Sequence, residues 1–61
     1  MFRITGNKQN VNVKECIAST ESDLPNKSKC EEMIIGIGSE CFIINTASVA
    51  FLDEGYNWVV K

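Results

Sequence analysis

The sequence predicts a mostly β fold, arranged either as a small β-meander or as a barrel-like sheet. Two apolar runs, Glu40–Ile44 and Val49–Leu52, flank the short polar insert Asn45–Ser48. A second insert around Gly55 leads into the apolar stretch Trp58–Val60. Apolar runs of this length, separated by turn residues, are typical of antiparallel strands joined by hairpins. The C-terminal third of the chain is therefore expected to form a three-stranded meander.

The 61 residues of the chain leave room for one domain. We place this small domain over residues 1–61, with the meander at residues 40–61. A domain of this size buries only about 60% of the surface that its unfolded chain exposes, so it is marginally stable alone. Such chains often depend on disulfides, a metal or a partner subunit.

The N-terminal part supplies further candidate strands. Apolar and polar residues alternate in Phe2–Thr5, the turn residues Gly6 and Asn7 follow, and alternation resumes in Val11–Val13. The stretch Lys14–Ala18 either continues as a strand or bends into a helical turn. Its β-branched neighbours favour the strand.

The middle of the chain contains the one place where we expect a helix. Pro25 suits the first position of a helix, which would have Asp23 near its N-terminus and be completed by Glu31, Glu32 and Met33. Such a helix would make only about two turns, which is marginal without tertiary support. A plain surface loop is the alternative.

A short apolar run, Met33–Ile35, lies between this segment and the meander and is closed by Gly36 and Gly38. It predicts either a strand or a connector that crosses under the meander. The two glycines lack the Gly-Lys-Ser/Thr that completes a phosphate-binding loop, so we interpret them as turn residues.

The register of the meander decides which of its side chains share a face. With Asn45–Ser48 as the first turn, Phe42 lies opposite Phe51. A second turn over residues 53–55 would place Gly55 in the left-handed conformation. One face then carries Cys41, Ile43, Ala50, Leu52, Tyr56, Trp58 and Val60. The other face carries Phe42, Ile44, Val49, Phe51 and Val59.

Both predicted faces are apolar, whereas a solvated antiparallel sheet is polar on one side. Either the N-terminal strands and the Pro25 segment wrap the sheet into a small barrel, or one face is buried against another subunit or another protein. A one-residue slip in the second turn would move the Trp58 side chain to the opposite face of the sheet. The candidate partner-binding residues on the second face are Phe42, Ile44, Val49 and Phe51.

Charge and hydropathy argue against two classes of partner. The formal net charge is -2 and the six basic residues are scattered, which disfavours nucleic-acid binding. The charge-free run Cys41–Leu52 is shorter than the ~20 residues that span a bilayer. The N-terminal residues become polar too early for a signal peptide, so we expect synthesis inside the cell and no secretion by a signal peptide.

The three cysteines, Cys16, Cys30 and Cys41, are widely spaced and include no Cys-x-x-Cys pair. Their odd number favours reduced, buried thiols over a disulfide framework. We expect no metal and no cofactor, because the chain has no His and three cysteines are one short of the usual structural zinc site.

No motif in the sequence indicates catalysis. The adjacent carboxylates Glu31-Glu32 and Asp53-Glu54 point apart on regular structure, and a Cys nucleophile would lack a His base. Tyr56 and Trp58 would stack on a carbohydrate if exposed, although a single Trp in a meander is more often part of the core. We expect a protein that is not an enzyme.

One resemblance concerns about two-thirds of the chain. Its short motifs are Thr20–Pro25, Gly38-Ser39, Phe42–Thr46, Val49–Phe51, Asp53–Gly55 and Trp58. This pattern resembles small proteins encoded in the structural-gene regions of phages and prophages. The segment Phe2–Ile17, Ala50 and the cysteines lie outside the pattern.

The resemblance implies a non-enzymatic virion component, such as a head, tail or decoration accessory, that is repeated by symmetry. Our first hypothesis is therefore a phage structural or accessory protein that acts by self-association or protein–protein contact, in the virion or the host cytoplasm. The second is a small phage inhibitor that occludes the surface of a host protein. The third is a small enzyme or metal protein.

Overall fold

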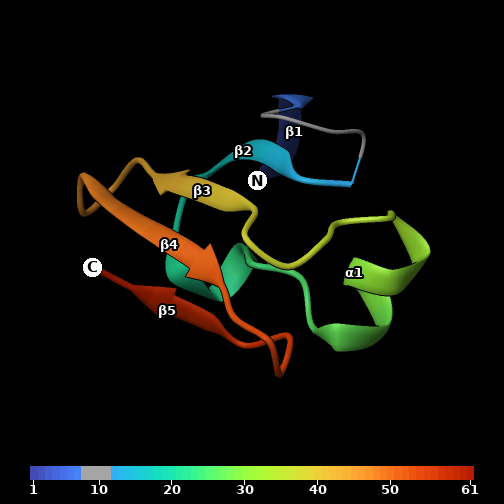
Figure 1. The fold of residues 1–61 in the computed structure, drawn as a ribbon. Helices are drawn as coiled ribbons and strands as arrows, with labels where there is room; N and C mark the ends of the chain where they lie inside the picture. The colour runs from blue at the N-terminus through green and yellow to red at the C-terminus, as the bar shows by residue number, and fades with distance from the viewer. Residues whose placement is uncertain (8–11) are drawn as a thin grey trace.

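The computed structural model describes residues 1–7 and 12–61, which form five β-strands, one 3₁₀ helix and one α-helix (Figure 1). The elements in chain order are β1 (Phe2–Asn7), β2 (Lys14–Ala18), η1 (Glu21–Asp23), α1 (Lys27–Glu32), β3 (Glu40–Ile43), β4 (Ser48–Leu52) and β5 (Trp58–Val60). The predicted mostly β fold is confirmed. The predicted alternation in Val11–Val13 begins outside the described residues.

The strands form one sheet in the order β1-β2-β3-β4-β5. Strand β2 pairs with β3 in parallel, whereas β1–β2, β3–β4 and β4–β5 are antiparallel. A parallel pair requires a long connection that returns the chain to the starting end of the sheet, and here this connection contains η1 and α1. The N-terminal strands therefore lengthen the sheet of the meander and do not wrap around its second face.

The first hairpin of the meander is shifted by two residues from the predicted register. Phe42 lies opposite Val49, and the last pair before the turn joins Ile43 to Ser48. Ala47 closes this turn with a left-handed φ of 52°, a conformation that the sequence did not indicate. Because side chains alternate with a period of two, the shift leaves the side chains of the paired residues on their predicted faces.

The second hairpin shows the same two-residue shift, since Leu52 lies opposite Trp58. The prediction that Gly55 adopts the left-handed conformation is wrong, because Tyr56 does so with a φ of 61°. The carboxylate Oδ1 of Asp53 explains the longer turn: it accepts the backbone N–H groups of Gly55 and Asn57, each at 2.9 Å. Tyr56 consequently lies in the turn and not on the sheet face.

The short helix exists, but it begins two residues after Pro25. Asn26 caps it, since the side-chain Oδ1 of Asn26 accepts the N–H of Lys29 at 2.9 Å. A side-chain cap of this kind satisfies an N–H that the first turn leaves without a partner. Asp23 belongs to η1, where it closes a capping box with Thr20, and does not sit at the start of α1.

The run Met33–Ile35 forms the connector and not a strand. The N–H of Ile35 donates to the carbonyl of Cys30 at 2.8 Å, and the N–H of Ile34 donates to that of Glu31 at 3.3 Å. These two bonds make a Schellman motif, which ends a helix with a left-handed residue. Ile34 occupies that position with a φ of 57° and leaves 61% of its surface exposed.

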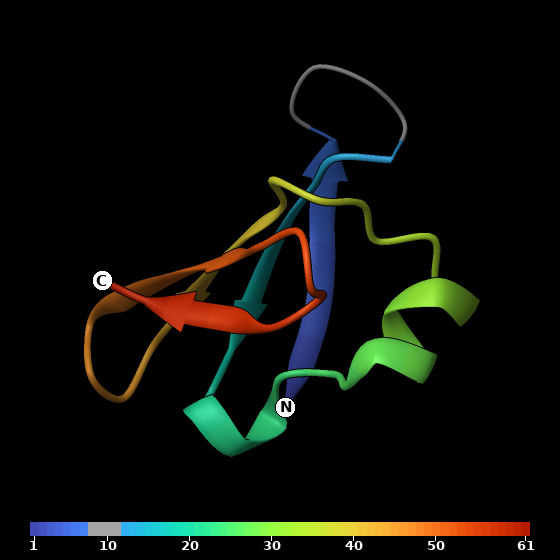
Figure 2. The same ribbon diagram turned by 60° about the horizontal axis from the view of Figure 1, so that its bottom comes forward.

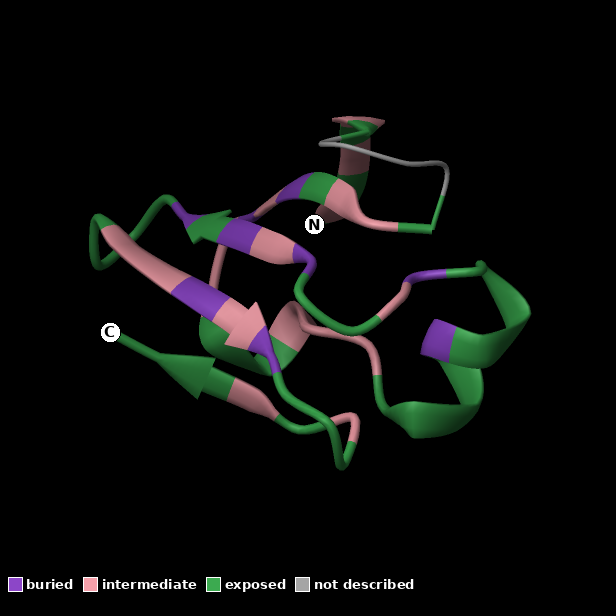
Figure 3. Ribbon diagram, in the orientation of Figure 1, coloured by how far each residue is buried: buried purple, intermediate pink, exposed green. Residues whose placement is uncertain are grey.

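The core lies on one side of the sheet, between the strands and the β2–β3 connection. Its buried hydrophobic residues are Cys16, Ala18, Cys30, Ile35, Cys41, Ile43, Ala50 and Leu52. Figure 3 shows buried residues alternating with exposed or half-buried ones along β2, β3 and β4. Figure 2 shows β1 and β5 running crosswise, so the sheet is strongly twisted. This twist lets Phe2 and Ile4 from β1 pack with Trp58 from β5 on the same core clusters.

Candidate interaction surface

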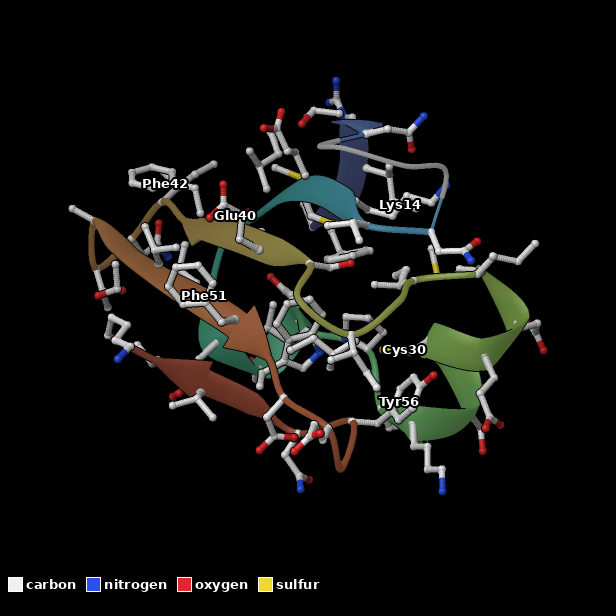
Figure 4. The ribbon with its side chains drawn as sticks, in the orientation of Figure 1. Lys14, Cys30, Glu40, Phe42, Phe51 and Tyr56 are labelled. Atoms are coloured by element: carbon white, nitrogen blue, oxygen red, sulfur yellow. The ribbon has the colours of Figure 1, made fainter. Side chains whose placement is uncertain are left out.

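The side of the sheet opposite the core, which we name the outer face, is built from two rows of side chains that cross the strands. The register places the residues of each row next to one another on neighbouring strands. The first row contains Arg3, Ile17, Phe42 and Val49, and the second row contains Glu15, Glu40, Phe51 and Val59. Glu40, Phe42 and Phe51 are labelled in Figure 4, on β3 and β4.

The apolar part of this face is open to solvent in the described structure. Phe42 is 43% exposed and Val59 is 44% exposed, while Ile17, Val49 and Phe51 are half-buried. Exposed apolar side chains gathered on one surface, beside a ring of charges, are typical of protein contact sites. No described segment of the chain covers this face, because both helices and the connector pack on the core side.

The structure brings together three of the four predicted partner-binding residues. Phe42, Val49 and Phe51 share the outer face, on the neighbouring strands β3 and β4. Ile44 lies just beyond the end of β3, in the turn, where its N–H donates to the carbonyl of Ala18 at 2.8 Å and 46% of its surface is exposed. Ile44 therefore borders the face and is not part of either row.

Sequence reasoning did not place Ile17, Glu15 and Arg3 at this surface. They reach it because β2 adds to the edge of β3 in parallel, with Ile17 opposite Phe42 and Glu15 opposite Glu40. The alternation of Glu15, Cys16, Ile17 and Ala18 in the sequence indicates two faces for β2. It contains no information on which strand β2 pairs with.

A shallow depression marks the acidic half of the outer face. It has a volume of about 250 Å³ and is lined by Thr5, Glu15, Cys16, Glu40, Phe42 and Val49. The hydroxyl of Thr5 donates to the backbone carbonyl of Glu15 at 3.0 Å, beside a β-bulge between β1 and β2. The depression thus combines an aromatic wall with two carboxylates.

The cysteines are free and buried, as predicted from their number and spacing. Burial raises the pKa of the Cys16 thiol to about 12 and the pKa of the Cys41 thiol to about 11. Burial also raises the pKa of the Cys30 thiol. A thiolate is the reactive form of cysteine, so burial disfavours the reactive form of all three side chains near neutral pH. In residues 1–7 and 12–61, no three His, Cys, Asp or Glu side chains are grouped as metal ligands.

A second depression of about 240 Å³ lies between α1 and the last turn. Cys30, Ile34 and Tyr56 are among its lining residues, and Figure 4 shows Cys30 and Tyr56 on this side of the molecule. The ammonium of Lys27 lies 6.0 Å from the centre of the Tyr56 ring. Of the carboxylates that were considered for catalysis, Asp53 is engaged in the turn and Glu32 pairs loosely with Lys29 at 3.8 Å.

Two further searches, for a membrane-spanning helix among the described residues and for related proteins, give negative results. Within the described ranges, no helix combines the length and the apolar character needed to cross a membrane. Comparison with protein-family models, curated proteins and solved structures gives no significant match. We therefore base the proposed function of the chain on the outer face.

Proposed function

We propose that this chain is a non-enzymatic structural or accessory protein of a phage or prophage, which acts through protein–protein contact or self-association. The outer face is the observation that carries the proposal, because it exposes Phe42 and Val59 beside the half-buried Phe51. Exposing such side chains to water is unfavourable by about 25 cal/mol per Å² of apolar surface, and a partner that covers them removes this cost. The resemblance of the C-terminal motifs to virion accessory proteins supports the phage context.

Among the described residues, the groups that line the depression on the outer face also suit a binding role. The carboxylates Glu15 and Glu40 lie in an open depression, and the one thiol nearby, Cys16, has its pKa raised to about 12. A contact surface requires only the apolar side chains and the charges around them.

The experiment that tests this proposal is binding of the purified chain to purified head and tail proteins of the same phage or prophage. We expect the wild-type chain to bind one of them and Phe42→Ser to weaken binding at least tenfold. Ile37→Ser is the matched control, since Ile37 is 47% exposed but lies in the connector, away from the outer face. Circular dichroism and thermal unfolding establish that both variants remain folded.

Two results would contradict the proposal in different ways. Binding to a host enzyme with loss of its activity, in the absence of binding to virion proteins, would favour the inhibitor hypothesis. Equal binding by Phe42→Ser and Ile37→Ser would show that the outer face is not the contact surface.

A further inference from the structure

The two edges of the sheet differ in how well they are protected against pairing with another chain. On the edge strand β1, a β-bulge between Ile4 and Gly6 interrupts the register, and Arg3 is exposed. Bulges and charges are devices that keep edge strands from pairing with other chains. The opposite edge strand, β5, has neither a bulge nor a charged residue nor a Pro within its bounds, and only its length of three residues limits pairing.

The hydrogen bonds to β4 show which backbone groups of the β5 segment are already paired. The N–H of Lys61 donates to the carbonyl of Val49 at 2.8 Å, and the N–H of Asp53 donates to the carbonyl of Asn57 at 2.9 Å. Hydrogen-bonded pairs recur at every second residue of an antiparallel ladder. Val59, midway between Asn57 and Lys61, therefore also directs its N–H and C=O toward β4.

The backbone groups of Trp58 and Val60 consequently point away from β4, along the edge of the sheet. Among the described residues, none pairs with these N–H and C=O groups. Figure 1 shows β5 as the outermost strand on its side of the sheet, with no other segment beyond its far edge. Such a row of donors and acceptors is matched by another extended chain.

We propose that β5 pairs with β5 of a second copy of this chain, antiparallel about a two-fold axis at Val59, so that the two sheets join edge to edge. In this register, Trp58 of each copy lies opposite the partner's Val60, and each such pair exchanges both of its backbone hydrogen bonds. Every outward-facing backbone group of β5 is then satisfied. The inference goes beyond the proposed function, because it concerns the edge of the sheet and not the outer face.

The apolar side chains of β5 are complementary to a second copy in this register. On the core side, Val60 is 37% exposed and would lie beside the partner's Trp58. On the outer face, Val59 is 44% exposed and would lie beside the partner's Val59. Directly opposite apolar side chains on neighbouring strands stabilise a sheet, and here they also lose apolar surface to water.

The charges at the ends of β5 fit the same arrangement. Lys61 would lie opposite the partner's Asn57, which has Asp53 opposite it on the next strand. The Lys61 ammonium of each copy therefore comes near the acidic turn that contains the partner's Asp53 and Glu54. The two Lys61 side chains lie at opposite ends of the paired strands, so the arrangement sets no like charges side by side.

A shifted register uses the edge less well. With the axis at Trp58, Val60 would lie opposite the partner's Tyr56. Tyr56 has a φ of 61°, which is incompatible with an extended strand. The axis at Val59 instead pairs both outward-facing residues of β5 with each other.

Sedimentation equilibrium of the full 61-residue chain tests the inference, at concentrations up to about 1 mM because a three-residue edge predicts a weak dimer. Since Val59 meets its own copy at the axis, Val59→Lys and Val59→Glu each place two like charges about 5 Å apart. We expect each variant to raise the dissociation constant about tenfold or more. An equimolar mixture of the two should restore dimerisation, because the charges at the axis are then opposite.

Two further variants separate the edge from other surfaces. Val60→Pro removes an N–H that points away from β4, and Pro is tolerated on an edge strand at such a position. We expect it to weaken dimerisation about tenfold, since symmetry removes the same hydrogen bond twice. Ile37→Lys is the matched control, because it adds a charge at an exposed position of the connector and should leave dimerisation unchanged. Thermal unfolding of each variant establishes that it is folded.

A wild-type chain that stays monomeric up to about 1 mM would overturn the inference. So would dimerisation that Val59→Lys does not weaken, or a mixture of the Lys and Glu variants that does not recover. A monomeric chain whose binding to virion proteins is weakened by Val60→Pro would show that another protein, and not a second copy, occupies the edge.

Failure of this inference is distinguishable from failure of the proposed function. Phe42 lies on β3, away from the edge, so Phe42→Ser should leave the dimer intact. A monomeric chain whose binding to virion proteins is lost in Phe42→Ser would disprove the dimer and leave the proposed function standing. A dimer that Val59→Lys disrupts, in a chain that binds no virion protein, would support the edge pairing and contradict the contact role of the outer face.

Discussion

The indole N–H of Trp58 donates to the backbone carbonyl of Pro25 at 2.9 Å, and so ties the last strand to the segment before α1 across 33 residues of sequence. Removing one partner of a part-buried hydrogen bond typically costs about 1 to 2 kcal/mol, because the other group is left unsatisfied. We expect Trp58→Phe to lower the free energy of unfolding by about this amount in urea denaturation. Tyr56→Phe should change it by less than about 0.5 kcal/mol, since the Tyr56 hydroxyl has no described partner.

Gly36 should not tolerate a side chain. A Cβ atom at this position would lie 2.7 Å from the backbone oxygen of Asn12 and 3.0 Å from its Cβ, and neither belongs to the end of a flexible side chain. We expect Gly36→Ala to lower the free energy of unfolding by about 2 kcal/mol, because the connector has to move away from the segment before β2. The control is Gly6→Ala, whose Cβ would meet its nearest atom at 3.9 Å. Equal stability of the two variants would contradict the packing of the connector.

Ile34→Gly should stabilise the protein. The left-handed conformation costs a β-branched residue about 1 to 2 kcal/mol, and Gly adopts it without this strain. Part of the gain is lost because Gly makes the unfolded chain more flexible, which leaves a net stabilisation of about 0.5 to 1 kcal/mol. Thermal and urea unfolding would measure it. Ile37→Gly, at an exposed position without a positive φ, should instead destabilise the chain by a similar amount.

The stability should fall at alkaline pH because of the buried thiols. Folding raises the pKa of Cys16 to about 12 and that of Cys41 to about 11, both above the ordinary value of 9.0. The folded state therefore holds these protons more tightly than the unfolded state, so stability is fully present below about pH 9 and decreases from there toward pH 11 to 12. Urea denaturation between pH 7 and pH 11 would show the decrease. The double variant Cys16→Ala with Cys41→Ala should show a shallower decrease.

The meander was predictable because its signals are local. Asn45, Thr46 and Gly55 mark the turns, and the alternation of side chains assigns Phe42 and Phe51 to the same face. The exact register was not predictable, since Ala47 and Tyr56 adopt left-handed conformations at positions where a sequence would lead one to expect Gly or Asn. The faces of the paired strand residues were nevertheless correct, because both hairpins shift by an even number of residues, whereas Ile44 and Tyr56 lie in the turns.

The outer face was predictable only in part, because half of it depends on a pairing between distant segments. Ile17 and Glu15 join Phe42 and Glu40 through the parallel contact of β2 with β3. Side-chain periodicity describes a strand and its turns but not its neighbours. Through the same contact the N-terminal strands lengthen the sheet at one edge, and no described segment covers the second face.

The parallel pairing of β2 with β3 also has a consequence for how fast the chain folds. The hairpins β1–β2, β3–β4 and β4–β5 each join strands that follow one another closely, so their closure costs little chain entropy. Ala18 and Ile43 can pair only after the whole β2–β3 connection has closed into a loop. The entropy of closing this loop is therefore lost before β2 and β3 make any contact. Non-local pairing of this kind slows folding. We therefore expect the meander to form early and the docking of the N-terminal hairpin on β3 to limit the folding rate.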